Sequence, residues 1–188
     1  MSASKIMIIR HAEKPSDDGS IVGVSQDGLT DPEELIVQGW QRSGALVRFF
    51  KPNCGPFSNP ALATPDVIFA SGVGKHSRSL RSQHTVLALA EFLRLQIDLS
   101  HLKGDERDLV ADAIKRSGNV LIAWEHELIP TIADQIPGTH PPHPRKWPGE
   151  RFDLVWVFDR GADTQDWTFT QIPQMLLPED HSDLIPVP

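Results

Sequence analysis

A continuous apolar run at residues 6–9 ends abruptly in charge, at Arg10 and His11. Unbroken apolar runs of this length are typical of strands that are covered on both faces, as in a parallel sheet. Pro15 follows and blocks a regular continuation of the strand. Because open α/β sheets bind ligands beyond the carboxyl ends of their strands, this stretch predicts a ligand site. Taken alone, it is equally consistent with two polar residues that merely leave a core strand.

Two further apolar runs have the same form. Residues 67–70 lead through a glycine-containing turn to Arg78 and Arg81, and residues 119–124 run directly toward His126. In a parallel sheet, groups that follow different strands lie on the same edge although they are far apart in the chain. This convergence favours one functional site over a set of unrelated surface charges.

Helical periodicity places both arginines and Thr85 in the opening turns of the helix after the second run, on one face. The helix dipole disfavours positive charge at the amino-terminal end of a helix. This local conflict indicates that a bound anion completes the site.

The rest of the chain alternates helical and strand patterns. The first helix is expected to begin at Asp31 as N-cap, with Pro32 at its first position. The expected helices are residues 31–50, 78–97, 105–115 and 129–136, and two late strands, 152–159 and 167–170, would form a hairpin at the sheet edge. This order predicts a three-layer α/β/α fold, a mixed and mostly parallel sheet with helices on both faces, in one domain over residues 1–188.

Composition narrows the possible functions. The net charge of −7 argues against a nucleic-acid binder but leaves room for an anionic substrate in a local arginine pocket. The single cysteine, Cys54, cannot form an internal disulfide and fits a reducing compartment. The sequence has neither an apolar run long enough for a membrane span nor a signal-peptide pattern. We therefore expect a cytoplasmic protein without a membrane partner.

Three motifs together resemble a known family. They are residues 8–13 (IIRHAE), residues 69–71 (FAS) with 81–85 (RSQHT), and residues 120–126 (VLIAWEH). In this order and strand context the sequence resembles the histidine phosphatase superfamily, which includes phosphoglycerate mutases and histidine acid phosphatases. The resemblance extends from Lys5 to about residue 136.

The resemblance implies that His11 is a nucleophile that becomes phosphorylated, while Arg10, Arg81 and His126 hold the phosphoryl oxygens. A neutral imidazole can attack phosphorus and leave again, which divides hydrolysis into two easier displacements. Guanidinium groups match the phosphoryl oxygens with paired hydrogen bonds and offset their charge. For this reason no metal or other cofactor is implied.

Some assignments within the family pattern need a choice. Arg81 is favoured over Arg78 because the family has a threonine four residues after this arginine, where Thr85 stands. Arg78 is then a supporting phosphate contact or a solvated residue, and Glu13 is a further candidate for substrate binding. His84 and His76 are expected to be structural or surface residues.

Several residues compete for the role of the acid that protonates the leaving group. The acid-phosphatase branch has an aspartate directly after the second histidine, where Glu127 stands here. A protonated carboxyl group could serve in that place. The competing acids are Glu13, Asp105 and Glu106.

The sequence thus predicts a phosphoric monoester hydrolase that acts on phosphomonoesters or on protein phosphohistidine. Its partner would be a small phosphorylated molecule or a phosphoprotein. The alternatives are a phosphoglycerate mutase-type phosphotransferase and a phosphate-binding regulatory domain without catalysis.

Overall fold

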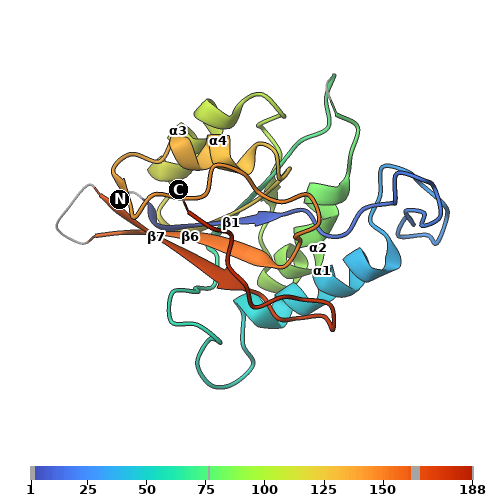
Figure 1. Cartoon of the computed structure of the whole chain (residues 1–188), viewed down its shortest axis with the longest axis horizontal. Helices are drawn as coiled ribbons and strands as arrows, with labels where there is room; N and C mark the ends of the chain where they lie inside the picture. Colours follow the sequence, from blue (N-terminus) through green and yellow to red (C-terminus); the bar gives the residue numbers. More distant parts are fainter. Residues whose placement is uncertain (1–2, 76, 162–165, 188) are drawn as a thin grey trace.

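The apolar run at the start of the chain forms the central strand of one sheet in the computed structural model, which describes residues 3–75, 77–161 and 166–187 (Figure 1). The strands are β1 (Ala3–Arg10), β2 (Val67–Ala70), β3 (Ile97–Asp98), β4 (Gly118–Trp124), β5 (Thr139–His140), β6 (Leu154–Arg160) and β7 (Trp167–Pro173). The helices are α1 (Val37–Phe50), α2 (Arg81–Leu93), α3 (Glu106–Lys115) and α4 (Ile129–Asp134). Within these ranges, no helix combines the length and apolar character that a bilayer span needs. His76 lies outside the described residues.

The strand order is β3-β2-β4-β1-β6-β7-β5. The first four strands in this order are parallel, β6 and β7 run antiparallel beside β1, and β5 pairs in parallel with β7. Arg10 lies opposite Trp124 and Ala70 lies opposite Ala123, so β1, β2 and β4 end at one edge. The predicted mixed, mostly parallel sheet is confirmed.

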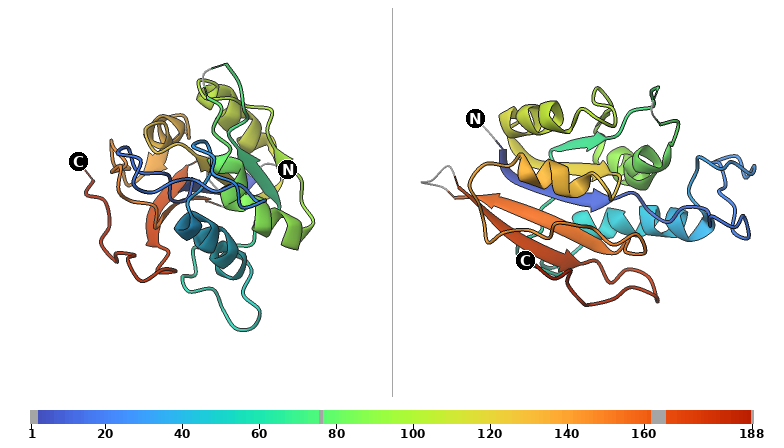
Figure 2. Two further views of the ribbon diagram at one scale, coloured as in Figure 1. Left: turned by 90° about the vertical axis from the view of Figure 1, so that its right-hand side faces the viewer. Right: turned by 45° about the horizontal axis from the view of Figure 1, so that its top comes forward.

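Apolar side chains cover both faces of β1, as its unbroken pattern predicts. Ile6 and Ile8 belong to the core that α3 and α4 cover, while Met7 and Ile9 belong to the core under α1 and α2. Figures 1 and 2 show the two pairs of helices on opposite sides of the sheet. Since the side chains of a strand alternate between the two faces of the sheet, a strand is apolar at every position only when both of its faces are buried. The three-layer α/β/α class is confirmed.

The first helix begins later than predicted. α1 starts at Val37, whereas Asp31 accepts a hydrogen bond from the backbone of Glu33 (2.8 Å) in a turn. The Ile36 N–H donates to the carbonyl of Glu13 (3.1 Å) and the Glu33 carbonyl accepts from Leu80 (3.1 Å). These long-range bonds satisfy backbone groups that a helix from Asp31 would have paired locally, so the prediction for residues 31–36 is wrong.

The second helix is shorter than predicted at both ends. α2 begins at Arg81, so Arg78 precedes the helix. Arg94 takes a left-handed conformation (φ 57°) that ends α2, and Ile97 pairs with Ile68 as part of β3. A chain that leaves a helix through this conformation turns sharply, which places the next residues on the sheet.

The predicted hairpin is present as β6 and β7. It does not form the edge, because β5 adds outside β7.

Gly39 in α1 allows the helix to approach the segment that follows β1. A Cβ atom at this position would lie 2.7 Å from the carbonyl oxygen of Glu13, closer than van der Waals contact permits. The helix therefore supports the chain just beyond His11.

Candidate active site

A cavity of about 580 Å³ opens at the edge where the parallel strands end. Figure 2 (left) looks onto this edge. The cavity is lined by Arg10, His11, Lys14, Glu33, Ser71, Lys75, Ser77, Arg78, Ser79, Arg81, Ser82, Lys103, Glu125, His126 and Glu127. The sequence-predicted residues His11, Arg10, Arg81 and His126 are all among them, so the structure brings the four together.

His11 is held through its backbone and one ring nitrogen, and the other ring nitrogen has no hydrogen bond among the described residues. Its backbone N–H donates to the carbonyl of Trp124 (2.9 Å), which continues the pairing of β1 with β4. The ring Nδ1 lies 2.7 Å from the carbonyl oxygen of Ala12, and a carbonyl can only accept, so Nδ1 carries the proton. The Nε2 atom then keeps its lone pair. Burial and the nearby Arg10 hold the pKa of His11 well below 6.5, so the imidazole is neutral.

The guanidinium of Arg10 is fixed on one side and free on the other. Its Nη1 donates to the carbonyls of Gly149 and Arg151 (3.1 Å to the latter), and its Cζ lies 3.7 Å from the centre of the Phe152 ring. Its Nε and Nη2 are buried and have no hydrogen-bond partner among the described residues. Burial lowers the pKa of Arg10 to about 10, which leaves it protonated at neutral pH. A charged fork of two N–H donors therefore remains unused.

Thr85 connects the segment of His11 to the helix of Arg81. Its hydroxyl donates to the Arg81 carbonyl (2.7 Å) and accepts from the Ala12 N–H (2.7 Å). Arg81 itself donates from Nη1 to the carbonyl of Pro32 (3.1 Å), while its Nε is buried without a partner among the described residues. One threonine thus sets the second arginine relative to the histidine.

His126 follows β4 directly and lies on the same edge. Burial, and then the charge of Arg10, lower the pKa of its imidazole. Its Nδ1 is buried and unpartnered within the described part of the chain.

The unpartnered atoms are concentrated at this site. Of the six buried side-chain nitrogens or oxygens that lack a hydrogen-bond partner among the described residues, four are Arg10 Nε and Nη2, Arg81 Nε and His126 Nδ1. A buried donor without a partner costs about 1–3 kcal/mol, so folded proteins rarely keep several together without a ligand or ordered water to pair with them. A tetrahedral anion offers enough acceptors to satisfy all four atoms.

The other candidate residues are divided between the cavity and its surroundings. Arg78 and Glu127 line the cavity and are exposed. Glu13 does not line it, because the carboxylate is turned toward Arg42 and bound there (2.7 Å). The prediction of Glu13 as a substrate-binding residue is therefore not supported by its placement.

Two of the competing acids also lie elsewhere. Asp105 accepts from the Leu102 N–H (2.9 Å), Glu106 accepts from the Trp124 indole (3.1 Å), and neither lines the cavity. Of the four acids that the sequence singled out, Glu127 alone lines the cavity. His84 lies outside the cavity and contacts Glu34 (2.6 Å), as expected of a structural residue.

Sequence reasoning missed several charged residues of the cavity. Glu125 stands beside His126 at the charged end of the third apolar run, although the sequence indicates no role for it; its carboxylate pairs with Lys103. Lys103 follows β3, whose two residues are too few to leave a strand pattern. Glu33 lies in the turns that replace the predicted start of α1.

The neutral state of His11 predicts how stability depends on pH. Its folded pKa is well below 6.5, so as the pH falls below 6.5 the unfolded chain takes up a proton that the folded chain does not. Stability is therefore expected to fall with pH in this range, and the lowered pKa of His126 acts in the same direction. Urea unfolding at about pH 5 and about pH 7.5 measures the loss. His11→Asn should weaken the dependence; an unchanged dependence in this variant would contradict a buried neutral His11.

Comparisons with known proteins bear on the fold of the chain. No protein-family model and no curated protein sequence matches the chain. Among solved structures, the chain is similar to the protein histidine phosphatase SixA in complex with tungstate, with a TM-score of 0.53 and 13% identity over 90% of this chain and 97% of that one. It is also similar to a mycobacterial glucosyl-3-phosphoglycerate phosphatase in complex with VO3, with a TM-score of 0.50 and 13% identity over 89% of this chain and 97% of that one. The chain therefore has the histidine phosphatase fold that its three sequence motifs predicted.

Proposed function

We propose that this protein is a metal-independent phosphatase that works through a phosphohistidine on His11. The observation that carries the proposal is the set of four unpartnered buried nitrogens on Arg10, Arg81 and His126 beside a neutral imidazole. Positively charged N–H groups that have no acceptor suit the binding of a phosphoryl group. An imidazole nitrogen with a free lone pair suits attack on the phosphorus of that group.

The reaction has two displacements. In the first, His11 Nε2 forms a bond to phosphorus while the bond from phosphorus to the leaving oxygen breaks, and the leaving oxygen takes up a proton. In the second, water attacks the phosphorus of the phosphohistidine while the bond from phosphorus to Nε2 breaks, and the proton that the water loses returns to the group that protonated the leaving oxygen. Inorganic phosphate then leaves and the neutral imidazole is regenerated. Both transition states spread negative charge over the equatorial oxygens, which Arg10 and Arg81 stabilise as fixed donors.

His126 serves as a third donor once the anion is bound. In the empty site burial and Arg10 lower its pKa. A phosphoryl dianion beside the ring favours the charged imidazolium and raises the pKa again. The proton is thus taken up when substrate binds and is retained through both steps.

Glu127 is the proposed acid for the leaving group. It lines the cavity, whereas Glu125 there pairs with Lys103. Glu127→Gln should slow hydrolysis of an alkyl phosphate by about 10²-fold and leave p-nitrophenyl phosphate little changed, because nitrophenolate leaves without a proton. Glu125→Gln is the matched control. If both substrates lose rate equally in Glu127→Gln, this residue is not the acid.

The outer part of the cavity favours a substrate with a further anionic group. Lys75 and Arg78 line it and are exposed, and neither has an ion-pair partner among the described residues. SixA is named as a protein histidine phosphatase and the mycobacterial enzyme as a glucosyl-3-phosphoglycerate phosphatase. A panel of sugar phosphates, nucleotides and a phosphohistidine peptide would identify the substrate class for this chain.

The primary test is incubation of the purified protein with p-nitrophenyl phosphate in the presence of a chelator. Release of nitrophenol and phosphate at equal rates is expected. A mutase-type phosphotransferase would instead pass the phosphoryl group to an added acceptor faster than to water. Tight binding of inorganic phosphate without any product would show a binding domain and overturn the proposed activity.

A further inference from the structure

The free fork of Arg10 is aimed by a segment far away in the sequence, residues 149–153. The carbonyls of Gly149 and Arg151 both accept from Arg10 Nη1, and Phe152 lies against the face of the same guanidinium. A guanidinium is planar and rigid, so fixing Nη1 also fixes the direction of Nε and Nη2. The orientation of the proposed phosphate donors therefore depends on where this segment lies.

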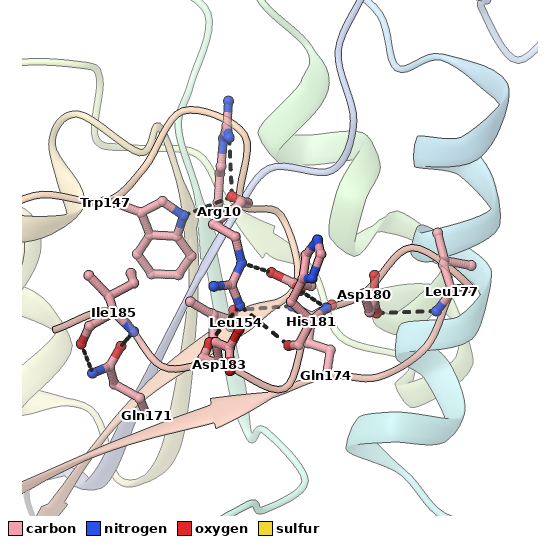
Figure 3. Close-up of polar contacts among 12 residues, drawn as sticks. Arg10, Trp147, Leu154, Gln171, Gln174, Leu177, Asp180, His181, Asp183 and Ile185 are labelled. Atoms are coloured by element: carbon pink, nitrogen blue, oxygen red, sulfur yellow. Dashed lines mark hydrogen bonds and ion pairs between the residues drawn. The ribbon is translucent and has the colours of Figure 1, made fainter.

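The carboxy-terminal tail, residues 174–185, holds that segment through Arg151. The Arg151 side chain donates from Nε to Asp153 (2.6 Å) and from Nη2 to the carbonyls of Asp183 (2.9 Å) and His181 (3.4 Å). The His181 N–H donates to the second carboxylate oxygen of Asp153 (2.6 Å). Figure 3 shows these tail residues gathered beneath Arg10.

The ion pair between Arg151 and Asp153 is largely shielded from water, whereas the bonds from Arg151 Nη2 to the tail carbonyls of Asp183 and His181 are exposed. The side chains of Arg151 and Asp153 are 12% and 5% exposed. A shielded ion pair is screened less by salt than a surface pair, and its two partners hold each other in a defined geometry. The backbone carbonyl of Arg151 also accepts from the Trp147 indole (2.8 Å), so the residue is fixed at both its backbone and its side chain.

The tail also contacts Arg42, which binds the segment that follows His11. Arg42 of α1 binds Glu13, two residues after His11, and also binds Asp180 and Gln174 of the tail. The Arg42 and Asp180 side chains are 3% and 2% exposed. The tail thus joins the segment after His11 to the segment that surrounds Arg10.

We propose that Arg151 is a positioning residue of the active site: by clamping residues 149–153 to the tail, it directs the free donors of Arg10 into the cavity. This rests on the proposed role of Arg10 in binding the phosphoryl group. Arg151 itself does not line that cavity.

The test is a double-mutant cycle of Arg151→Met with Arg10→Ala. Two readouts are measured: the affinity for inorganic phosphate by calorimetry, and kcat/KM for p-nitrophenyl phosphate. Arg151→Met alone should weaken both by about tenfold, since a small misplacement of a catalytic group has effects of this size or larger. In the Arg10→Ala background it should cause little further loss, because the group that it positions is gone.

Gln171→Ala is the matched control. Gln171 makes two hydrogen bonds to the backbone of Ile185 (2.8 and 3.2 Å), at the far end of the same tail, and among the described residues its side chain makes no hydrogen bond to residues 149–153. The Gln171→Ala variant should have a lower melting temperature than the wild-type protein, but the same affinity for inorganic phosphate. Asp153→Asn, which keeps a side chain of the same shape, replaces Arg151→Met if that variant does not fold, with the same non-additive loss expected.

The outcomes separate this proposal from the proposed function. An equal loss from Arg151→Met with and without Arg10 would overturn the positioning role, as would a loss of phosphate affinity in Gln171→Ala as large as in Arg151→Met. Phosphate binding without turnover in the wild-type protein would overturn the proposed phosphatase activity. The double-mutant cycle could then still test the role of Arg151 through the affinity for inorganic phosphate. A wild-type protein that binds no phosphate would overturn both.

Discussion

Replacing His11 by alanine is expected to lower kcat for p-nitrophenyl phosphate by at least about 10⁴-fold, as loss of a nucleophile does in other enzymes. The reason is that Nε2 is the atom proposed to form the covalent bond, and burial together with the nearby Arg10 keeps the imidazole neutral by lowering its pKa. Stopped assays at substrate saturation measure the loss. His101→Ala is a suitable control, because His101 contacts Asp112 (3.3 Å) and lies outside the cavity.

A second measurement makes this prediction specific to covalent catalysis. Rapid quenching of the wild-type protein with substrate should trap phosphate bound to protein that is lost in acid and stable in base. His11→Ala should show none, while its affinity for inorganic phosphate should remain measurable because Arg10 and Arg81 are still present. Substantial turnover by His11→Ala, or an unchanged phosphoenzyme, would remove His11 from the mechanism.

Arg81→Ala should cost about 3 kcal/mol of transition-state stabilisation, roughly 10²-fold in kcat/KM, by analogy with loss of one oxyanion donor. Its Nε is a buried donor without a partner among the described residues, and its helix is joined to the His11 segment through Thr85. Arg78→Ala removes a neighbouring arginine that is exposed and precedes α2, so its effect on the same substrate should stay within a few-fold.

The pair of arginine variants also tests the choice between them. Steady-state kinetics on Arg81→Lys should show little recovery, since an ammonium cannot reproduce the geometry of a guanidinium fork. A silent Arg81→Ala together with a strongly impaired Arg78→Ala would reverse the assignment.

Much of the fold could be predicted because its main signals are local. Strands β1, β2 and β4 are apolar at successive positions, which only coverage on both faces explains, and their parallel arrangement places the residues after each strand on one edge. The short strands β3 and β5 have two residues each and leave no periodic pattern. The start of α1 was misplaced because the backbone of residues 31–36 bonds to Glu13 and Leu80 rather than within a helix.

The amino-acid sequence by itself determined which side chains stand at the strand ends, and so brought His11, Arg10, Arg81 and His126 into one hypothesis. Only the tertiary structure decided how they are oriented and which acidic residues lie beside them. It turned Glu13 away to Arg42 and placed Glu127 in the cavity. The physical reason is that apolar periodicity is written in neighbouring residues, whereas the partners that orient Arg10 lie about 140 residues further along the chain and meet it only after folding.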